Sequence, residues 1–202
     1  MAYILGFLFA DGNIIKTKRG THFVAFYTAD YDLLRLMAIA MQSTHKIAAR
    51  GKSGGVVYVL QIGSKELFND VVALGLTPNK SKRMRLPGIP AEYIPDFIRG
   101  YFDGDGNVWT GILNKKRTKP TSAITASFTC ASREFLYDLH RKFKMLGIKG
   151  GFIHSIKSKN CSRLSFSILD SLKIYKIMYN TPHELFLVRK KLVFEKFKAM
   201  RP

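Results

Sequence analysis

The sequence predicts an α+β fold made of one structural unit that occurs twice in the chain. Residues 4–13 and 98–107 resemble each other, because in both a glycine lies within an apolar run that ends in Asp-Gly-Asn. The two copies align at one offset of 94 residues, which pairs Gly6 with Gly100 and Asp11 with Asp105. An internal repeat of this kind constrains the architecture before any local assignment is made. The same order of elements is expected after each copy, α-β-β-α-β-β-α in each half, with a last helix near the C-terminus.

Each repeated stretch is predicted to be a buried helix, because residues 4–10 and 97–102 are mostly apolar. A glycine in the middle of a helix costs about 1 kcal/mol relative to alanine. Gly6 and Gly100 therefore indicate that the two helices approach each other closely. A basic β-hairpin is expected after each helix. The first has strands at 13–18 and 21–28, and the second has strands at 108–114 and 121–130.

The remaining elements follow from periodicity and from capping residues. Helices are predicted at 31–42 and 132–146, where Ser132 is a suitable N-cap and Gly147 a suitable stop. Further strands are expected at 46–50, 56–62, 151–157 and 162–168, followed by helices at 65–74, 171–180 and about 184–200. Prolines place a linker at about 77–92. The expected domains are residues 1–92, which include the linker, and residues 93–202.

The charge of the chain indicates a polyanionic partner. Lys and Arg total 33 and Asp and Glu total 14, so the formal net charge is +19 over 202 residues. A folded protein with this excess repels itself, and nucleic acid is the leading partner. The basic residues are dispersed in short clusters, which indicates one long surface instead of a tail. The expected DNA contacts from these clusters are Lys16, Lys18, Arg19, Arg50, Lys52, Lys82, Arg83, Lys115, Lys116, Arg117, Lys119, Lys157, Lys159 and Lys191.

Several classes of protein are disfavoured by composition. An apolar fraction of 47% is ordinary for a globular protein and argues against disorder. No run approaches the roughly 18–20 apolar residues of a membrane helix, and no secretory signal is evident. We therefore expect a soluble intracellular protein with no membrane partner. Cys130 and Cys161 are expected to be free thiols, and the five histidines show no metal-ligand spacing.

The strand at 121–130 has two different faces. Thr125, Ser127 and Thr129 lie on one side, and apolar residues alternate with them on the other. Arg163 and Ser165 alternate with apolar residues in the same way. Such a pattern fits an antiparallel sheet with a plain solvent face. It also fits a sheet that lies against base edges in the major groove of DNA, which admits a two-stranded ribbon.

Asp11 and Asp105 are expected at the C-terminal ends of the two repeated helices. The helix dipole is negative at that end, and two neighbouring carboxylates raise each other's pKa or require a counter-ion. The pattern thus predicts a divalent-metal site, since Mg²⁺ binds through one or two carboxylates together with phosphate oxygens and water. The alternative is that Asp-Gly simply begins a turn after each helix.

The two repeated stretches resemble the paired motifs of the LAGLIDADG homing endonucleases. Residues 75–82 followed by 94–106 resemble the linker and second motif of the single-chain members, so that the resemblance covers essentially the whole chain. It implies a pseudo-twofold saddle, with the motif helices at the centre and two antiparallel sheets that form the DNA-binding surface. The implied activity is Mg²⁺-dependent cleavage of both strands of a long, asymmetric double-stranded DNA site by an intron-encoded monomer. Mn²⁺ is expected to substitute for Mg²⁺.

Residue by residue, the resemblance makes Asp11 and Asp105 the essential metal-binding acids, with Ala10 and Gly104 beside them in the metal site. It also implies one basic catalytic residue per half, Lys80 and Lys190, with Lys82 and Lys191 as alternates. The sequence departs from the family pattern at one position, which is Asp103 in the second motif and Phe9 in the first. That position is not the main metal ligand of the family.

Two other functions remain open at this point. A non-cleaving binder on the same fold could be an RNA maturase that acts on its host intron RNA, or a DNA-binding regulator. A basic structural protein, such as a ribosomal component, would not need two matching helices that end in an acid. The presence of both Asp11 and Asp105 favours the endonuclease.

Overall fold

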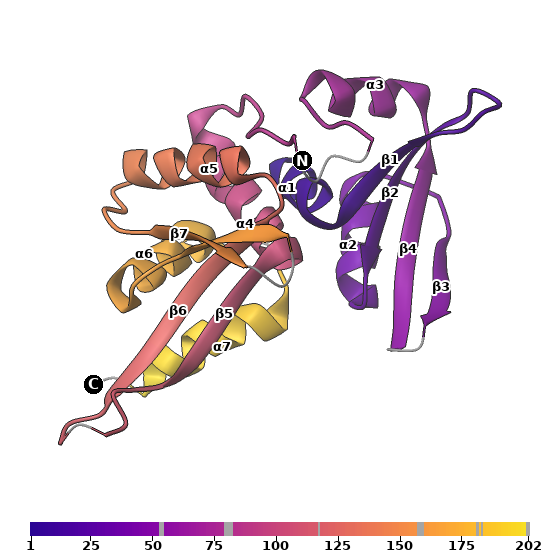
Figure 1. Ribbon diagram of the computed structural model, residues 1–202. Coiled ribbons are helices and arrows are strands. Elements are labelled where there is room, and N and C mark those ends of the chain that lie inside the picture. The colour runs from indigo at the N-terminus through magenta and orange to yellow at the C-terminus, as the bar shows by residue number, and fades with distance from the viewer. Residues whose placement is uncertain are drawn as a thin grey trace.

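A computed structural model describes residues 1–52, 55–78, 83–116, 118–156, 160–180, 182 and 184–200. These residues form seven α-helices and two four-stranded antiparallel sheets, arranged in two similar halves (Figure 1). The N-terminal half contains α1 (Ala2–Asp11), β1 (Gly12–Lys16), β2 (His22–Thr28), α2 (Tyr31–Ala40), β3 (Ile47–Lys52), β4 (Gly55–Gly63) and α3 (Lys65–Ala73). The C-terminal half contains α4 (Ile94–Asp105), β5 (Gly106–Leu113), β6 (Thr121–Cys130), α5 (Arg133–Met145), β7 (Phe152–Ile156), β8 (Cys161–Ser165), α6 (Ile168–Tyr179) and α7 (Val188–Ala199). The predicted fold class and the duplicated order of elements are confirmed.

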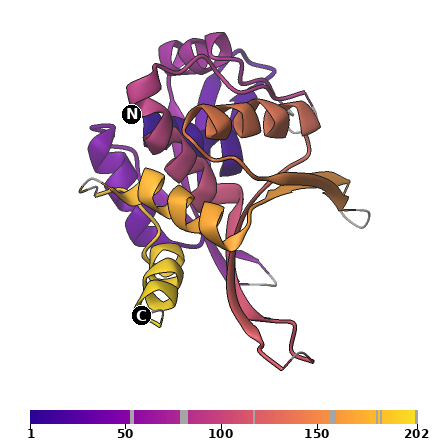
Figure 2. The same ribbon diagram turned by 90° about the vertical axis from the view of Figure 1, so that its left-hand side faces the viewer.

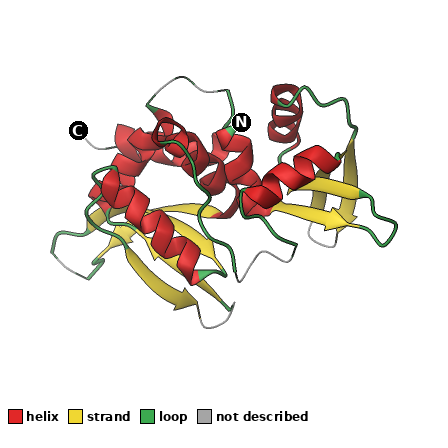
Figure 3. Cartoon of the chain, turned by 90° about the horizontal axis from the view of Figure 1, so that it is seen from above, coloured by secondary structure: helices red, strands yellow, loops and turns green. Residues whose placement is uncertain are grey.

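The two sheets have the same topology. Their strand orders are β1-β2-β4-β3 and β5-β6-β8-β7, and the glycine that follows each motif helix has an equivalent partner. Gly12 pairs with Phe26, and Gly106 pairs with Phe128. Helices gather on one side of each sheet, as the view from above shows (Figure 3). The hairpin of β5 and β6 extends beyond the helices (Figure 2).

Helices α1 and α4 pack against each other at the centre of the molecule, and their backbones are in direct contact. A Cβ atom built on Gly6 would lie 2.1 Å from the carbonyl oxygen of Phe97, and one built on Gly100 would lie 1.9 Å from that of Tyr3. Only glycine fits at such a distance, so the expectation drawn from Gly6 and Gly100 is confirmed. Large buried side chains surround this contact, and each is worth about 1.5–3 kcal/mol when fully buried. They include Phe7, Phe9, Phe97, Tyr101 and Phe102.

Several element ends differ from the predicted ones for local reasons. The predicted N-cap of α5 is confirmed, because the side chain of Ser132 accepts a hydrogen bond from the backbone N–H of Phe135. Helix α6 begins at Ile168, three residues earlier than predicted, because Ser167 accepts from the N–H of Asp170 and caps it. Helix α7 begins only at Val188. Gly147 follows α5 with φ +82°, the left-handed conformation that ends helices.

None of the helices in the described part of the chain is long and apolar enough to cross a membrane. Cys130 and Cys161 are both free thiols, the first buried and the second partly exposed.

Candidate active site at the paired helix ends

The ends of α1 and α4 bring the two repeated acids to one place. The helices run in the same direction, because Gly6 lies against Phe97 whereas Gly104, seven residues further along α4, lies against Ala10. Asp11 and Asp105 are the last residues of their helices. A Cβ on Gly104 would be 3.4 Å from Oδ2 of Asp11. The carboxylate of Asp11 therefore lies beside the last turn of the helix that carries Asp105.

The chain leaves both helices in the same conformation. Gly12 and Gly106 are extended, with φ/ψ of −94°/167° and −82°/157°, and each begins the first strand of its sheet. The acids therefore lie at the point where the two sheets diverge. Asp11 is exposed and Asp105 is partly exposed. Both lie at the negative end of a helix dipole, an arrangement that favours a bound cation.

The side chain of Lys190 lies against the last turn of α4. Its ammonium donates to the carbonyl oxygens of Phe102 at 2.6 Å, Asp103 at 2.8 Å and Gly106 at 2.7 Å, and lies 3.3 Å from that of Gly104. The side chain is only 7% exposed. Burial lowers the pKa of Lys190 to about 8, and the neighbouring charge of Asp103 opposes that shift. The structure thus places Lys190 next to the acids, but its ammonium binds the backbone that carries Asp105.

Asp103 is a buried residue of the same last turn of α4, with 2% of its surface exposed. Its Oδ2 accepts hydrogen bonds from the hydroxyl of Tyr3 at 2.7 Å and from the backbone N–H of Leu187 at 2.8 Å. Its Oδ1 has no hydrogen-bond partner among the described residues. Burial raises the pKa of Asp103 to about 6, although these hydrogen bonds lower it. The equivalent residue of the first motif, Phe9, is fully buried and packs edge-on against Phe97 at 5.7 Å between ring centres.

Arg99 completes a buried network that the sequence did not reveal. It donates to the carbonyl oxygens of Leu185 at 2.9 Å and Met178 at 3.0 Å, and its guanidinium lies 2.7 Å from the carboxylate of Asp96. The only signal in the sequence is a basic residue in the apolar first part of the second motif, where the first motif has Leu5. Through this network α4 is tied to the segment that leads into α7, and hence to Lys190.

The predicted DNA contacts differ in their exposure to solvent. Those at exposed positions are Lys16, Lys18, Arg19, Arg50, Arg83, Lys115, Lys116 and Lys119. Those outside the described residues are Lys80, Lys82, Arg117, Lys157 and Lys159, together with the side chain of Lys52. The sheet-face residues Thr125, Thr129, Arg163 and Ser165 are partly exposed. Ser127 shares their face but is buried at 3% exposure, and the ammonium of Lys191 lies over the ring of Phe186.

The oxygen donors at the helix ends suit a divalent cation. The described residues contain no group of three or more His, Cys, Asp or Glu side chains that could hold a metal ion by itself. Asp11 and Asp105 supply two carboxylates, and Mg²⁺ is usually bound by one or two carboxylates plus water and substrate phosphate. The residues present therefore fit a cation that the protein shares with a phosphodiester, and not a cage made by the protein alone.

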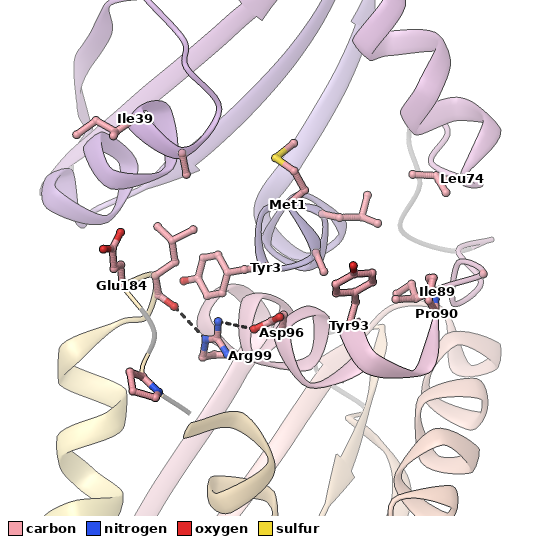
Figure 4. A pocket seen from close by; sticks show the side chains of 16 residues that line it. Met1, Tyr3, Ile39, Leu74, Ile89, Pro90, Tyr93, Asp96, Arg99 and Glu184 are labelled. Atoms are coloured by element: carbon pink, nitrogen blue, oxygen red, sulfur yellow. Dashed lines mark hydrogen bonds and ion pairs between the residues drawn. The ribbon is translucent and has the colours of Figure 1, made fainter. Parts of the chain in front are cut away.

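A cavity of about 800 Å³ lies at the opposite end of the same two helices. Figure 4 shows Met1, Tyr3 and Tyr93 around this cavity. The ion pair of Arg99 with Asp96 and its hydrogen bond to the carbonyl oxygen of Leu185 lie in the cavity wall. Ala10, Asp11, Gly104, Asp105 and Lys190 do not line it. This cavity is therefore separate from the candidate site.

Comparison with known proteins agrees with this geometry. Residues 92–180 match the model of the LAGLIDADG-like domain family. A solved structure of the meganuclease I-SmaMI bound to uncleaveable DNA is 13% identical, with a TM-score of 0.65 over 98% of this chain and 88% of that chain. I-DmoI in complex with DNA and Mn is 18% identical, with a TM-score of 0.61 over 90% and 97%. The LAGLIDADG meganuclease I-AabMI bound to uncleaved DNA is 16% identical, with a TM-score of 0.63 over 98% and 88%.

A curated sequence relative is a probable translation initiation factor IF-2 of Thermococcus kodakarensis, which is 26% identical over 182 residues. The match covers 86% of this chain, but the chain spans only 14% of the length of that relative. Residues 92–180 are thus a LAGLIDADG-like domain, and the chain as a whole has the fold of the single-chain, two-domain LAGLIDADG homing endonucleases.

Proposed function

We propose that the protein is a site-specific endonuclease that hydrolyses both strands of a long, asymmetric double-stranded DNA site with a divalent cation. One observation carries the proposal. The parallel packing of α1 and α4 brings Asp11 and Asp105 to one accessible place, where both sheets begin. A single chain contains both halves of this arrangement, so the active species is expected to be a monomer.

The cation would be held by the carboxylates of Asp11 and Asp105, at the helix ends that also contain Ala10 and Gly104. Mg²⁺ is the expected ion, and Mn²⁺ is expected to replace it because both prefer oxygen ligands. A bound divalent cation lowers the pKa of a coordinated water and stabilises negative charge on a phosphate. The fold neighbours offer a parallel, since I-DmoI was solved with Mn and I-SmaMI with calcium ions.

The two predicted lysines have different roles in this proposal. Lys190 is a positioning residue, because its ammonium holds the backbone carbonyls on both sides of Asp105. Lys80 keeps its sequence-based role as a cation beside the scissile phosphate, and it lies outside the described residues.

The basic surface would hold the DNA backbone. Lys16, Lys18 and Arg19 are exposed around the β1–β2 hairpin, and Lys115, Lys116 and Lys119 are exposed around the β5–β6 hairpin. Such contacts release counterions, so the logarithm of the binding constant should fall with the logarithm of salt concentration, with a slope of roughly −0.9 per phosphate contacted.

The test uses Asp11→Asn and Asp105→Asn on a target selected from a library of DNA sites. Both variants should bind the target with near wild-type affinity but linearise a plasmid that carries it at least about a hundredfold more slowly in Mg²⁺. Asp32→Asn is the matched control, because the side chain of Asp32 is 89% exposed on α2. If both site variants cut at the wild-type rate, the assignment of the site is wrong. Specific binding by the wild type with no metal-dependent cutting would identify a non-cleaving binder instead.

A further inference from the structure

The open face of the N-terminal sheet is mostly apolar, although it belongs to a strongly basic protein. Successive residues of β1, β2 and β4 alternate between the core and the opposite face. The core side carries Ile14, Val24, Phe26, Leu60 and Ile62. The open side carries Ile15, Phe23, Ala25, Tyr27, Val57 and Val59, together with the polar residues Asn13, Arg50 and Gln61. Ala25 and Val59 are buried, yet they lie outside the contiguous hydrophobic core, which confirms that they face away from it.

The row of residues nearest the candidate site differs in chemistry between the two halves. In the N-terminal sheet this row is Tyr27, Val59 and Ala48, and in the C-terminal sheet it is Thr129, Arg163 and His154. The rows are equivalent, because each lies one residue beyond the pair made by the motif glycine, Gly12–Phe26 or Gly106–Phe128. Arg163 donates to the hydroxyl of Thr129 at 3.4 Å. The C-terminal row therefore offers three polar side chains, whereas the N-terminal row offers methyl groups together with the ring and hydroxyl of Tyr27.

The next rows differ less. Ala25 lies between Asn13 and Gln61, and its equivalent Ser127 lies between Asn107 and Ser165, so both rows carry polar side chains at their ends. Further out, Ile15 pairs with Phe23, whose ring leans to 3.4 Å from the Cβ position of Gly63. The equivalent pair is Trp109 with Thr125. Ile15, Phe23 and Tyr27 are all partly exposed, so their side chains are available to a ligand on this face.

Basic residues border this apolar surface. Lys16, Lys18 and Arg19 are exposed at the β1–β2 hairpin, and Arg50 is exposed on the edge strand β3. The surface is also continuous with the candidate site, because β1 begins one residue after Asp11. An apolar centre with a cationic rim suits a polyanion that presents apolar groups between its phosphates. In the major groove of DNA that apolar group is the 5-methyl of thymine, while the phosphates would meet the rim.

We propose that the N-terminal sheet recognises its half of the DNA site through thymine 5-methyl groups, which contact Ile15, Phe23 and Tyr27. The inference rests on the proposed function, since it assumes that DNA lies along the open faces. On the open face of the C-terminal sheet, Arg163 is suited to the O6 and N7 of guanine. The exposed side chains of Trp109 and Phe152 add apolar area to that face.

The test replaces each thymine of the selected target, in turn, by deoxyuridine, which removes the 5-methyl group and leaves the pairing edge unchanged. Affinity is measured with the Asp11→Asn variant so that cleavage does not interfere. Burial of one methyl group is worth roughly 0.8 kcal/mol, so each contacted thymine should bind about fourfold more tightly than deoxyuridine. Phe23→Ser and Tyr27→Ser remove the apolar contact and, unlike threonine, leave no side-chain methyl group that could replace it. In these variants the preference for thymine should fall to less than about twofold at the affected positions.

Thr125→Ala is the matched control and should leave the thymine preference at those positions unchanged. Thermal unfolding of the variants checks that these substitutions of partly exposed residues leave the fold intact. A target without thymines in either half, equal binding of thymine and deoxyuridine throughout, or a preference that survives both Phe23→Ser and Tyr27→Ser would overturn the inference. Methyl-dependent binding by a wild-type protein that never cuts would support this inference and refute the endonuclease. Metal-dependent cutting with no methyl dependence would do the opposite.

Discussion

Gly6→Ala tests whether the close contact of α1 and α4 is what holds the centre of the molecule. The added methyl group would lie 2.1 Å from the carbonyl oxygen of Phe97 and 2.9 Å from the backbone nitrogen of Tyr101. An ordinary contact begins at 3.4 Å, so the shorter of these distances falls short by about 1.3 Å. Both partners are backbone atoms. No change of rotamer can relieve the clash, and the two helices must move apart.

The size of the effect follows from three contributions. Overpacking in a core costs typically about 1–3 kcal/mol even where side chains can adjust. Separation by about 1 Å also loosens the neighbouring aromatic contacts, and a radial gap of this size forfeits roughly a quarter to a half of each dispersion well. Replacement of a mid-helix glycine by alanine returns about 1 kcal/mol. We therefore expect Gly6→Ala to lower the free energy of unfolding by about 2 kcal/mol or more.

Urea denaturation measures this loss, and Gly51→Ala is the control. A Cβ on Gly51 meets nothing within 4 Å, so the control should change stability by less than about 0.5 kcal/mol. Gly100→Ala should resemble Gly6→Ala, because its methyl group would lie 1.9 Å from the carbonyl oxygen of Tyr3. The double variant should lose less than the sum, since both substitutions separate the same two helices. A Gly6→Ala protein as stable as the wild type would refute the close-contact argument.

Two further predictions concern the buried groups of α4. The pKa of Asp103 is raised to about 6 by burial from an ordinary value of 3.8, so the native state keeps a proton that the unfolded chain loses. The contribution of Asp103 to stability should therefore fall by up to about 3 kcal/mol as the pH rises from 3.8 to about 6. In urea denaturation with EDTA present, the difference in stability between the wild type and Asp103→Asn should change by this amount across the window, and a difference that stays constant would contradict the reasoning. Lys190→Met leaves the carbonyls of Phe102, Asp103 and Gly106 without their donor. It should cost about 2 kcal/mol and slow cleavage with little loss of DNA affinity, whereas Lys196→Met, exposed on the same helix, should do neither.

The parts of the fold that could be predicted are those with a single physical explanation. A glycine in the middle of two apolar helices indicates close approach, and an offset of 94 residues that pairs two glycines and two aspartates indicates duplication. The element order followed from these features. The starts of α6 and α7 could not be predicted. The first depends on a capping hydrogen bond that the side chain of Ser167 accepts, and the second follows Leu187, whose backbone N–H donates to the distant Asp103.

The sequence predicts which residues form the candidate site, but it does not predict the hydrogen bonds that they make. The acids could be predicted from their place at the end of each repeated helix. The direction of a long side chain such as Lys190 has no sequence signal, and only the structure shows its ammonium at the end of α4. The partners of Asp103 are equally remote, since Tyr3 is 100 residues away and Leu187 is 84 residues away along the chain. In the sequence, Asp103 is notable only because the equivalent residue of the first motif is Phe9.

The two halves are alike where a substitution would cost much stability, and they differ where a substitution would cost little. A change at Gly6 or Gly100 would force two backbones apart, so the halves are alike where the helices touch. Tyr27 and Thr129 hold equivalent places on the open faces and contribute nothing to the core. Surface exchanges of this kind usually change stability by less than about 0.5 kcal/mol. Duplication could therefore preserve one shared centre while the two faces diverged freely. In the proposed enzyme that divergence is what lets a pseudo-symmetric protein select an asymmetric DNA site.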